Sequence, residues 1–367
     1  MNNPYDIAAY YWPAYHDEPR WRCFMPEGEG EWQTIRRAVP KFTGHWQPRV
    51  PAWGYVDEAD PRIMEKKIDA AARHGVNVFI FDWYWYENQP FLEDALNQGF
   101  LGARNNDEVR FYVMWANHDA TTLWDLEQSH EYKVIYPGAV DRTAFDLATS
   151  RLVERFFAHP SYYRIDGKPV LAIYEIGTLI KGLGGIPATR EAFAALRSAV
   201  HKAGFPGLHL QAILWGSIPE SLGMVPGDRT QTQDNTIRQL GFDSLTNYQW
   251  CHYVQPTGSY QAWGETAIAS WDKWAREFSV PFYPHVSIGW DTNPRFKERK
   301  HDLVTGGTPE LFGDFLRRAK QFVDAGRLSP RLITVNSWNE WSEGSYLEPD
   351  TVYGMRYLEA VSDAIAR

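Results

Sequence analysis

Short apolar runs rich in β-branched and aromatic residues recur along the chain, and longer amphipathic segments separate them. Continuous apolar runs are typical of strands that are buried on both faces, as in a parallel sheet. We therefore predict strands at residues 7–12, 76–83, 109–115, 169–175, 208–215, 242–248, 282–288 and 331–338.

The segments between these runs space their apolar residues as an amphipathic helix does. We predict helices at residues 60–75, 89–100, 141–159, 189–204, 260–278, 308–326 and 353–366, with a weaker one around 236–241. Several of these helices finish at a glycine, namely Gly75, Gly204 and Gly326. Glycine takes the left-handed conformation of a helix end most easily.

The alternation of strands and helices predicts an α/β fold in which helices cover parallel strands. About eight such units favour a single (β/α)₈ TIM barrel over residues 1–367, ahead of a doubly wound open sheet. No internal repeat or linker divides the chain, and no glycine-rich phosphate loop follows an early strand. The long segments 13–60, 116–142 and 216–240 are predicted to be βα loops that shape the rim of a site.

Polar and aromatic residues gather where the predicted strands end. In a (β/α)₈ barrel, the active site lies at these carboxyl ends. An aromatic ring stacks on the apolar face of a sugar, while the sugar hydroxyls bond to planar amides and carboxylates. The pattern therefore predicts an oligosaccharide or polysaccharide substrate. The candidate substrate-binding residues are Tyr11, Trp12, Asp82, Trp83, Trp115, Asn117, His118, Glu175, Trp215, Tyr248, Trp290, Asp291, Trp338 and Asn339.

Several members of this set also have structural readings. Asp82 could cap the turn that follows its strand, His118 could be a hydrogen-bonded loop histidine, and Glu175 could face away from a ligand. The 17 tryptophans and 20 tyrosines could mostly serve packing in a large core. Their position beside polar groups at strand ends is what favours a sugar site.

Composition and charge narrow the classes of partner. The net charge of −9 argues against a nucleic acid or an anionic membrane, because both need a basic face. No apolar run approaches ~18 residues and no basic-then-apolar segment precedes the first strand, so we expect a cytoplasmic protein. Cys23 and Cys251 are expected to be free thiols. The 11 histidines form no HExxH motif, and we expect neither a metal nor another cofactor.

The stretch NSWNEWSEGSYLEPD (336–350) follows the last predicted strand and carries two candidate catalytic acids, Glu340 and Glu343. On a helical turn, residues three apart share one face, at ~5–6 Å between Cβ atoms. Paired carboxylic acids cleave glycosidic bonds, and their mutual repulsion raises the pKa of one above that of the other. One of the acids could instead cap a helix start, a role that fits Glu348 well.

The segment 336–361 (NSWNEWSEGSYLEPDTVYGMRYLEAV) closely resembles the carboxyl-terminal signature of the WbsX family, whose barrel is similar to that of glycoside hydrolase family 99. The stretches GVNVFIFDWYWY, FYVMWANHD, IDGKPVLAIYE and SIGWDTNPR also resemble the family pattern in the same order. The resemblance extends from about residue 7 to residue 360.

This resemblance implies a (β/α)₈ glycosidase that retains anomeric configuration without a metal or an organic cofactor. In that scheme Glu340 would deprotonate the 2-hydroxyl of the sugar, which attacks C1 to give a 1,2-anhydro sugar. Glu343 would protonate the leaving oxygen and then activate the water or acceptor that opens the epoxide. Family 99 members characteristically carry His where Ser342 stands, and their second-strand and fourth-strand motifs differ, so mannose specificity and endo action do not follow.

Three other readings stay open. Glu175 could be the acid/base and Glu340 the nucleophile of an ordinary retaining glycosidase, whose acids lie on separate strands. The protein could be a glycosyltransferase of polysaccharide assembly, although the sequence has no DxD triplet and no glycine-rich loop at a helix start. A non-catalytic sugar-binding barrel is the third reading, and the presence of both acids weakens it.

Overall fold

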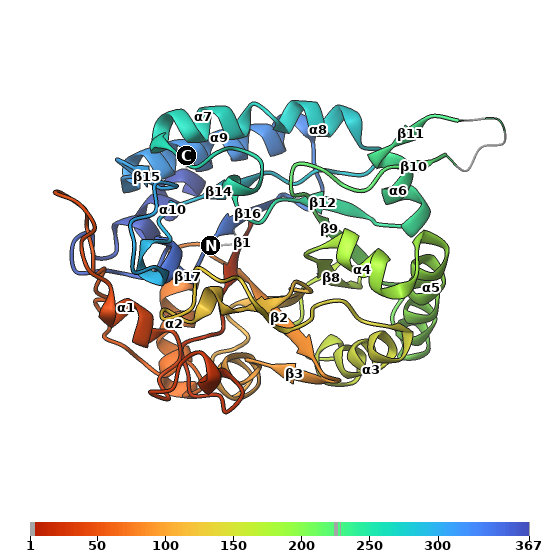
Figure 1. Ribbon diagram of the computed structural model, residues 1–367. Coiled ribbons are helices and arrows are strands. Elements are labelled where there is room, and N and C mark those ends of the chain that lie inside the picture. Colours follow the sequence, from red (N-terminus) through yellow and green to blue (C-terminus); the bar gives the residue numbers. More distant parts are fainter. Residues whose placement is uncertain (1–3, 224–226, 228, 367) are drawn as a thin grey trace.

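Eight parallel strands form a nearly closed barrel in the computed structural model, which describes residues 4–223, 227 and 229–366 (Figure 1). The (β/α)₈ prediction is thus confirmed. Around the barrel the order is β12-β9-β8-β4-β2-β1-β16-β14. The strands are β1 (Asp6–Tyr11), β2 (Val78–Tyr86), β4 (Arg110–Trp115), β8 (Lys168–Ile173), β9 (His209–Ile213), β12 (Ser244–Thr246), β14 (His285–Ser287) and β16 (Leu332–Asn336). Each overlaps one predicted strand.

Two contacts close the barrel. The first and last strands pair in parallel, with Asp6 opposite Leu332. At the remaining gap, Leu245 of β12 forms a parallel bridge with Phe282, just before β14. There the backbone N–H of Tyr283 donates to the carbonyl of Leu245 at 2.8 Å.

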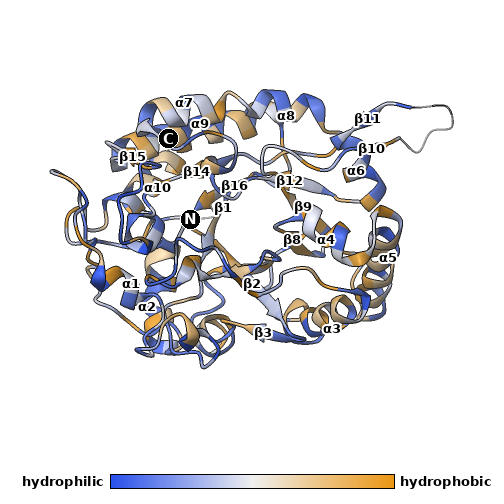
Figure 2. Cartoon of the chain, in the orientation of Figure 1, coloured by the Kyte–Doolittle hydropathy of each residue, from blue (hydrophilic) through white to orange (hydrophobic). Residues whose placement is uncertain are grey.

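Helices surround the strands as an outer ring (Figure 1). They are α2 (Pro61–Arg73), α3 (Arg142–Leu152), α5 (Ile186–Lys202), α6 (Gln233–Leu240), α7 (Tyr260–Ile268), α8 (Trp271–Glu277), α9 (Pro309–Gly326) and α10 (Arg356–Ala366). Figure 2 shows hydrophobic and hydrophilic stretches alternating along them, as expected for helices with one face on a barrel. In α2, for example, Met64, Ile68 and Ala71 are buried at helical spacing.

The helix predictions differ from the structure in three places. The segment 89–100 begins as a short strand, β3 (Gln89–Phe91), and only then turns into the wide helix Ala95–Phe100. The segment 260–278 divides into α7 and α8. Helices α1 (Trp32–Arg37) and α4 (Ile176–Leu183) are additional. The apolar residues of α4 closely follow those of β8. The sequence pattern therefore does not show where the strand spacing of two residues gives way to helical spacing.

The three predicted helix ends are confirmed to within two residues. Gly75 and Gly204 have positive φ angles of 86° and 96° after α2 and α5. Gly326 is the last residue of α9, but the left-handed residue is the next one, Arg327, at φ 50°.

Short strands and turns decorate the loops. They are β5 (Ala120–Thr121), β6 (Val134–Tyr136), β7 (Arg164–Ile165), β10 (Ser221–Leu222), β11 (Gln231–Thr232), β13 (Gly258–Ser259), β15 (Val304–Thr305), β17 (Asn339–Glu340) and β18 (Ser345–Tyr346), with 3₁₀ turns at Trp21–Cys23, Thr122–Trp124, Trp250–His252, Asn293–Arg295 and Trp341–Glu343 and a wide helix at Val153–Phe157. The predicted loops 13–60 and 116–142 are present. Part of the loop 216–240, at residues 224–226 and 228, lies outside the described residues.

Polar side chains cross the barrel interior and hydrogen-bond between strands that are not neighbours. Tyr112 of β4 donates to Gln211 of β9 at 2.9 Å, and the hydroxyls of Thr246 and Thr334 lie 2.8 Å apart. Between the neighbouring strands β14 and β16, the His285 ring also lies 2.9 Å from the Thr334 hydroxyl. These bonds satisfy buried polar groups and fix the strands beneath the site.

Candidate active site

The two acids of the sequence motif stand on a tight turn that follows β16. Strands β17 and β18 form an antiparallel hairpin, and the 3₁₀ turn Trp341–Glu343 joins them. Side chains three residues apart eclipse one another in a 3₁₀ turn, so Glu340 and Glu343 point the same way. The predicted helical turn is therefore present, but it belongs to this hairpin and not to the start of α10.

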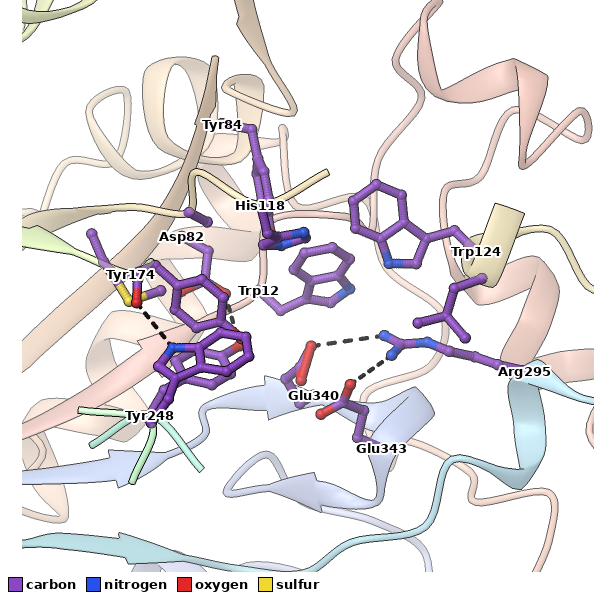
Figure 3. A pocket seen from close by; sticks show the side chains of 14 residues that line it. Trp12, Asp82, Tyr84, His118, Trp124, Tyr174, Tyr248, Arg295, Glu340 and Glu343 are labelled. Atoms are coloured by element: carbon purple, nitrogen blue, oxygen red, sulfur yellow. Dashed lines mark hydrogen bonds and ion pairs between the residues drawn. The ribbon is translucent and has the colours of Figure 1, made fainter. Parts of the chain in front are cut away.

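A cavity of about 230 Å³ opens at the carboxyl ends of the strands, with the two acids on its wall (Figure 3). Aromatic rings make up much of its lining. The residues that line it are Trp12, Asp82, Tyr84, Met114, Ala116, His118, Leu123, Trp124, Tyr174, Trp215, Tyr248, Arg295, Glu340 and Glu343.

Arg295 joins the acids. Its Nη1 lies 2.6 Å from Glu343 Oε1 and its Nη2 lies 3.9 Å from Glu340 Oε1 (Figure 3). Its Nε donates to Oε1 of the fully buried Glu31 at 2.9 Å, and Glu31 also accepts from Nε1 of Trp12 at 2.7 Å. Glu31 therefore holds both the cation and one ring of the cavity wall.

Burial raises the pKa of Glu340 well above its ordinary value, and the neighbouring charge of Glu343 raises it further. The cation of Arg295 acts in the opposite direction. The Glu340 side chain is 4% exposed and that of Glu343 is 12% exposed. Burial and repulsion therefore favour the protonated form of Glu340, while Glu343 forms an ion pair with Arg295.

Asp82 is a third acid of the cavity. Its Oδ2 accepts a hydrogen bond from the Tyr248 hydroxyl at 2.8 Å, and its buried Oδ1 has no hydrogen-bond partner. Burial raises the pKa of Asp82 well above its ordinary value. A buried acid with one unsatisfied oxygen is suited to bond to a ligand hydroxyl.

His118 packs among the rings of the cavity wall. Its ring lies 5.5 Å from Tyr84, 5.8 Å from Trp124 and 5.4 Å from Tyr174, between ring centroids. Burial lowers the pKa of His118, which favours its neutral form. Together these groups present flat apolar surfaces interspersed with hydrogen-bonding atoms.

The structure brings together some of the predicted substrate-binding residues and separates the others. Trp12, Asp82, His118, Trp215 and Tyr248 line the cavity with the two catalytic candidates. The side chains that do not line it are those of Tyr11, Trp83, Trp115, Asn117, Glu175, Trp290, Asp291, Trp338 and Asn339.

Strand geometry explains the first group of exceptions. Successive side chains of a strand point to opposite faces. On β2, Asp82 and Tyr84 face the cavity, whereas Trp83 faces outward and donates from Nε1 to Glu93 at 2.7 Å. Trp115 likewise stacks on Phe145 of α3 at 5.8 Å.

The same alternation places Tyr11 in the core, and Trp338, in the link between β16 and β17, is also buried there. The hydroxyl of Tyr11 donates to Glu58 at 2.9 Å, outside the cavity. The fully buried Trp338 packs against Phe79 at 5.0 Å between ring centroids.

Asn339 and Asn117 act on the backbone. Asn339 accepts from the N–H of Trp12 at 2.8 Å and donates to the Trp12 carbonyl at 2.7 Å, which fixes the position of that ring. Asn117 likewise forms two hydrogen bonds with the backbone of Glu175. It accepts from the N–H at 2.8 Å and donates to the carbonyl at 2.7 Å, which connects the ends of β4 and β8.

Glu175 caps α4. Its two carboxylate oxygens accept hydrogen bonds from the backbone N–H groups of Gly177 and Thr178, the former at 3.0 Å. An acid engaged in this way stabilises the helix start. The reading in which Glu175 is an acid/base opposite Glu340 therefore lacks the geometry it needs. Trp290 and Asp291 line a second cavity, behind the catalytic turn.

The sequence reasoning did not select Tyr84, Met114, Ala116, Leu123, Trp124, Tyr174 and Arg295, all of which line the cavity. Side chains two residues apart on a strand face the same way, so counting from Asp82 and from the end of β8 would have indicated that Tyr84 and Tyr174 face the cavity. Arg295 ends the SIGWDTNPR stretch, but a single arginine in a loop carries no positional signal. Glu31 lies in the long first loop and could not be placed from its sequence.

The structure also tests the predictions about cysteines and metal ligands. Cys23 and Cys251 are both free, as predicted. Within residues 4–223, 227 and 229–366, no group of three or more His, Cys, Asp or Glu side chains is arranged to hold a metal ion. Over the same part of the chain, no helix has both the length and the apolar character needed to cross a membrane.

The fold and the site define the class first: this is a (β/α)₈ barrel protein with a carboxylate pair set in an aromatic cavity. Within that class, the chain belongs to the family described as Glycosyltransferase WbsX, which matches residues 7–361. It is similar to the uncharacterized protein WxcX of Xanthomonas campestris pv. campestris, with 27% identity over 379 aligned residues. That match covers 99% of this chain and 50% of WxcX, so the chain spans about half the length of the curated relatives it matches.

Solved structures share the fold at low sequence identity. The GH99 endo-alpha-mannosidase from Bacteroides thetaiotaomicron is 16% identical with a TM-score of 0.60, covering 98% of this chain and 96% of that one. A glycoside hydrolase-like protein is 16% identical with a TM-score of 0.64, covering 99% and 94%. The exo-beta-1,4-mannosidase Op5Man5 from Opitutaceae bacterium strain TAV5 is 14% identical with a TM-score of 0.51, covering 99% and 59%.

Proposed function

We propose that this protein is a glycoside hydrolase that cleaves a glycosidic bond in an oligosaccharide or polysaccharide, with Glu340 and Glu343 as its acid/base pair. The observation that carries the proposal is the position of the two acids. They stand on one turn, share Arg295, and face a cavity whose walls are aromatic rings. Structures with the same fold are described as glycoside hydrolases, which supports the reaction class.

The size and lining of the cavity fit one sugar unit. A volume of about 230 Å³ lies just below the ~300 Å³ lower bound of drug-sized sites. Trp12, Trp124 and Trp215 offer ring faces or edges for the apolar side of a pyranose. Asp82 supplies a polar group for a hydroxyl of that unit.

The roles of the acids follow from their depth. Glu340, the more buried acid, is proposed as the base at the 2-hydroxyl of the bound sugar, and Glu343 as the acid/base at the leaving oxygen. The group that later activates water needs access to solvent, and Glu343 is the more exposed of the two. In this scheme C1–O2 bond formation expels the leaving group, which takes the proton of Glu343. Water then opens the 1,2-anhydro sugar with retention.

This scheme needs a proton on Glu343 when the leaving group departs. Burial and the neighbouring charge of Glu343 raise the pKa of Glu340, which favours its protonated form in the free protein. A sugar hydroxyl that donates a hydrogen bond to Glu340 stabilises its ionised form. Substrate binding therefore shifts the shared proton toward Glu343, where the leaving oxygen needs it.

Substitution of the acids tests the proposal. A screen of α- and β-linked oligosaccharides identifies a substrate, and NMR of the first product gives its anomer, which we expect to match that of the substrate. Glu343→Gln should then lower turnover by roughly 10²–10⁴-fold or more while leaving substrate binding measurable. Glu265→Gln, on the surface of α7, is the matched control and should retain activity. Unchanged turnover in Glu343→Gln on the natural substrate would remove that acid from the mechanism.

Leaving-group chemistry separates the two roles. On an aryl glycoside with a strongly acidic phenol, departure needs no proton, so Glu343→Gln should recover much of its first-step rate. Glu340→Gln should not recover, because the missing group acts on the sugar and not on the phenol. The reverse pattern would exchange the two assignments.

The family description names a second candidate, a glycosyltransferase. Calorimetry with UDP-sugars and GDP-sugars, with and without Mg²⁺, decides between the two. A hydrolase should bind none of them tightly, whereas a transferase that uses one of these donors should bind its own.

A further inference from the structure

A second cavity, of about 250 Å³, lies behind the catalytic turn and shares no lining residue with the first. The two adjoin through the backbone, since the N–H of Asp291 donates to the carbonyl of Glu343 at 2.7 Å. Gly344, the next residue, lines the second cavity. Six aromatic rings contribute to the wall, namely those of Phe42, Trp46, Tyr260, Trp290, Tyr353 and Tyr357.

Arg49 supplies the charge of this cavity. Its guanidinium carbon lies 4.9 Å from the ring centroid of Trp46 and 5.6 Å from that of Tyr346. Its Nη1 donates to the carbonyl of Gly344 at 3.0 Å, and its buried Nε has no hydrogen-bond partner. Across the described ranges, no carboxylate lies within 4.0 Å of the Arg49 guanidinium.

The nearest acid of the cavity is already engaged. Oδ2 of Asp291 lies 2.8 Å from His45 Nε2 and accepts from Gln47 Nε2 at 2.9 Å, while Oδ1 accepts from Asn293 Nδ2 at 2.8 Å. Asp291 therefore cannot turn to Arg49 without breaking this set. Against the effect of burial, the charge of Arg49 helps to lower the pKa of Asp291, but the two side chains form no direct ion pair. A guanidinium between rings and without a hydrogen-bonded carboxylate is suited to an anion from outside, which it can bind with two parallel hydrogen bonds.

Arg299 adds a second cation beside the wall, since its guanidinium lies 4.2 Å from the ring of Phe42, which lines the cavity. A positive charge here contrasts with the net charge of −9 and would attract an anionic ligand.

We propose that this second cavity binds a sugar unit that carries a carboxylate, such as a uronic acid, with the carboxylate on Arg49 and the sugar ring against Trp46 or Trp290. Both indoles are partly exposed, so their faces are available. An acidic glycan bound here would lie beside the catalytic turn. The binding does not depend on hydrolysis, so it can be tested whether or not the proposed reaction is correct.

The test compares methyl β-D-glucuronide with methyl β-D-glucoside, two probes that differ in the carboxylate. NMR titration of the full chain, followed on the indole N–H signals of Trp46 and Trp290, gives both affinities. We expect the glucuronide to bind at least about tenfold more tightly, since a hydrogen-bonded charge pair contributes that much. In Arg49→Gln the two affinities should become equal, and Arg49→Lys should keep part of the preference.

Two controls localise the effect. Arg318→Gln, on the surface of α9, should leave both affinities unchanged. Trp215→Ala removes a ring from the first cavity and should also leave the glucuronide affinity unchanged. If Arg49→Gln fails to fold, Trp46→Ala provides the second test, because it should weaken the glucuronide and leave sodium acetate unaffected.

Three results would overturn the proposal. The first is equal binding of the two glycosides by the unmodified protein. The second is a glucuronide preference that survives in Arg49→Gln. The third is acetate binding as tight as that of the glucuronide, which would show a site for small anions with no contribution from the sugar ring.

Discussion

Arg295 contacts three carboxylates, those of Glu31, Glu340 and Glu343, and all four side chains are largely buried. A guanidinium in this position stabilises the ionised forms of its neighbours. It sits where the loop that follows β14 meets the long first loop and the catalytic turn. The ionisation state of the catalytic pair is therefore set jointly by segments far apart in the sequence.

Replacement of Arg295 should change the pH dependence of the reaction. In Arg295→Gln the cation that lowers the pKa of Glu340 is lost, so the pair holds its proton to higher pH. We expect the pH profile of kcat/KM to move upward by about one unit or more. Arg295→Lys keeps the charge and should restore most of the original profile. A profile that does not move in Arg295→Gln would mean that Arg295 only packs against the acids.

How far the site could be predicted from the sequence differs from one residue to the next. Glu340 and Glu343 were accessible because a local spacing of three carries its own geometry. The wall residues were harder, since a strand-end motif such as DWYW offers neighbours that point to opposite faces, and only one face meets the cavity. Arg295 and Glu31 come from loops, where side-chain direction depends on tertiary contacts that no local pattern encodes.

At the scale of elements, α2 contributes a buried charge cluster below the catalytic turn. Lys67 of α2 pairs with Glu58 and with Glu348, and the side chains of all three are at most 3% exposed. Glu58 also accepts from Asn339 at 2.8 Å, and Glu348 accepts from Trp341 Nε1 at 2.8 Å. The cluster thus joins the first loop, α2 and the hairpin of the acids.

This cluster should make stability depend on pH. Two acids share one cation, and burial, opposed in part by Lys67, raises the pKa of Glu58 to about 7 from an ordinary 4.5. The folded chain then holds a proton that the unfolded chain releases between these two pH values. This contribution to the free energy of unfolding therefore falls as pH rises from about 4.5 to about 7, by a few kcal/mol, and levels above that.

Urea unfolding between pH 5 and 8 measures this effect. The difference in stability between the unmodified protein and Glu58→Gln should decline across the window, because the amide cannot titrate. Glu359→Gln, on the exposed side of α10, serves as the control and should show no such trend. A difference that is constant with pH would contradict the raised pKa of Glu58.

The elements themselves were largely predictable from periodicity. All eight barrel strands were found, because buried parallel strands are continuous apolar runs. Segment 89–100 was misjudged because its spacing also fits a helix, while pairing with β2 makes its first part a strand. The division of 260–278 at Ala269 and Ser270 depends on how two helices fit around the barrel, which lies beyond a one-dimensional pattern.

At the scale of the molecule, β1 pairs in parallel with β16, which brings the first and last barrel strands together. Six of the eight barrel strands pair with two neighbouring strands, and the Leu245–Phe282 bridge links the two ends of this row, so separating the barrel into halves would break hydrogen bonds on both sides. We propose that the chain is a single folding domain and unfolds in one cooperative step. Near-ultraviolet and far-ultraviolet circular dichroism should then give coincident urea transitions. Two separated transitions would indicate independently stable parts.

The closure of the barrel also has a consequence for biosynthesis. β1 is translated long before its partner β16, and both acids follow β16. A nascent chain therefore carries an open edge on β1 until β16 has been made, and would benefit from a chaperone that covers it. On the proposed function, a chain that terminates before this hairpin lacks both Glu340 and Glu343 and should have no hydrolase activity.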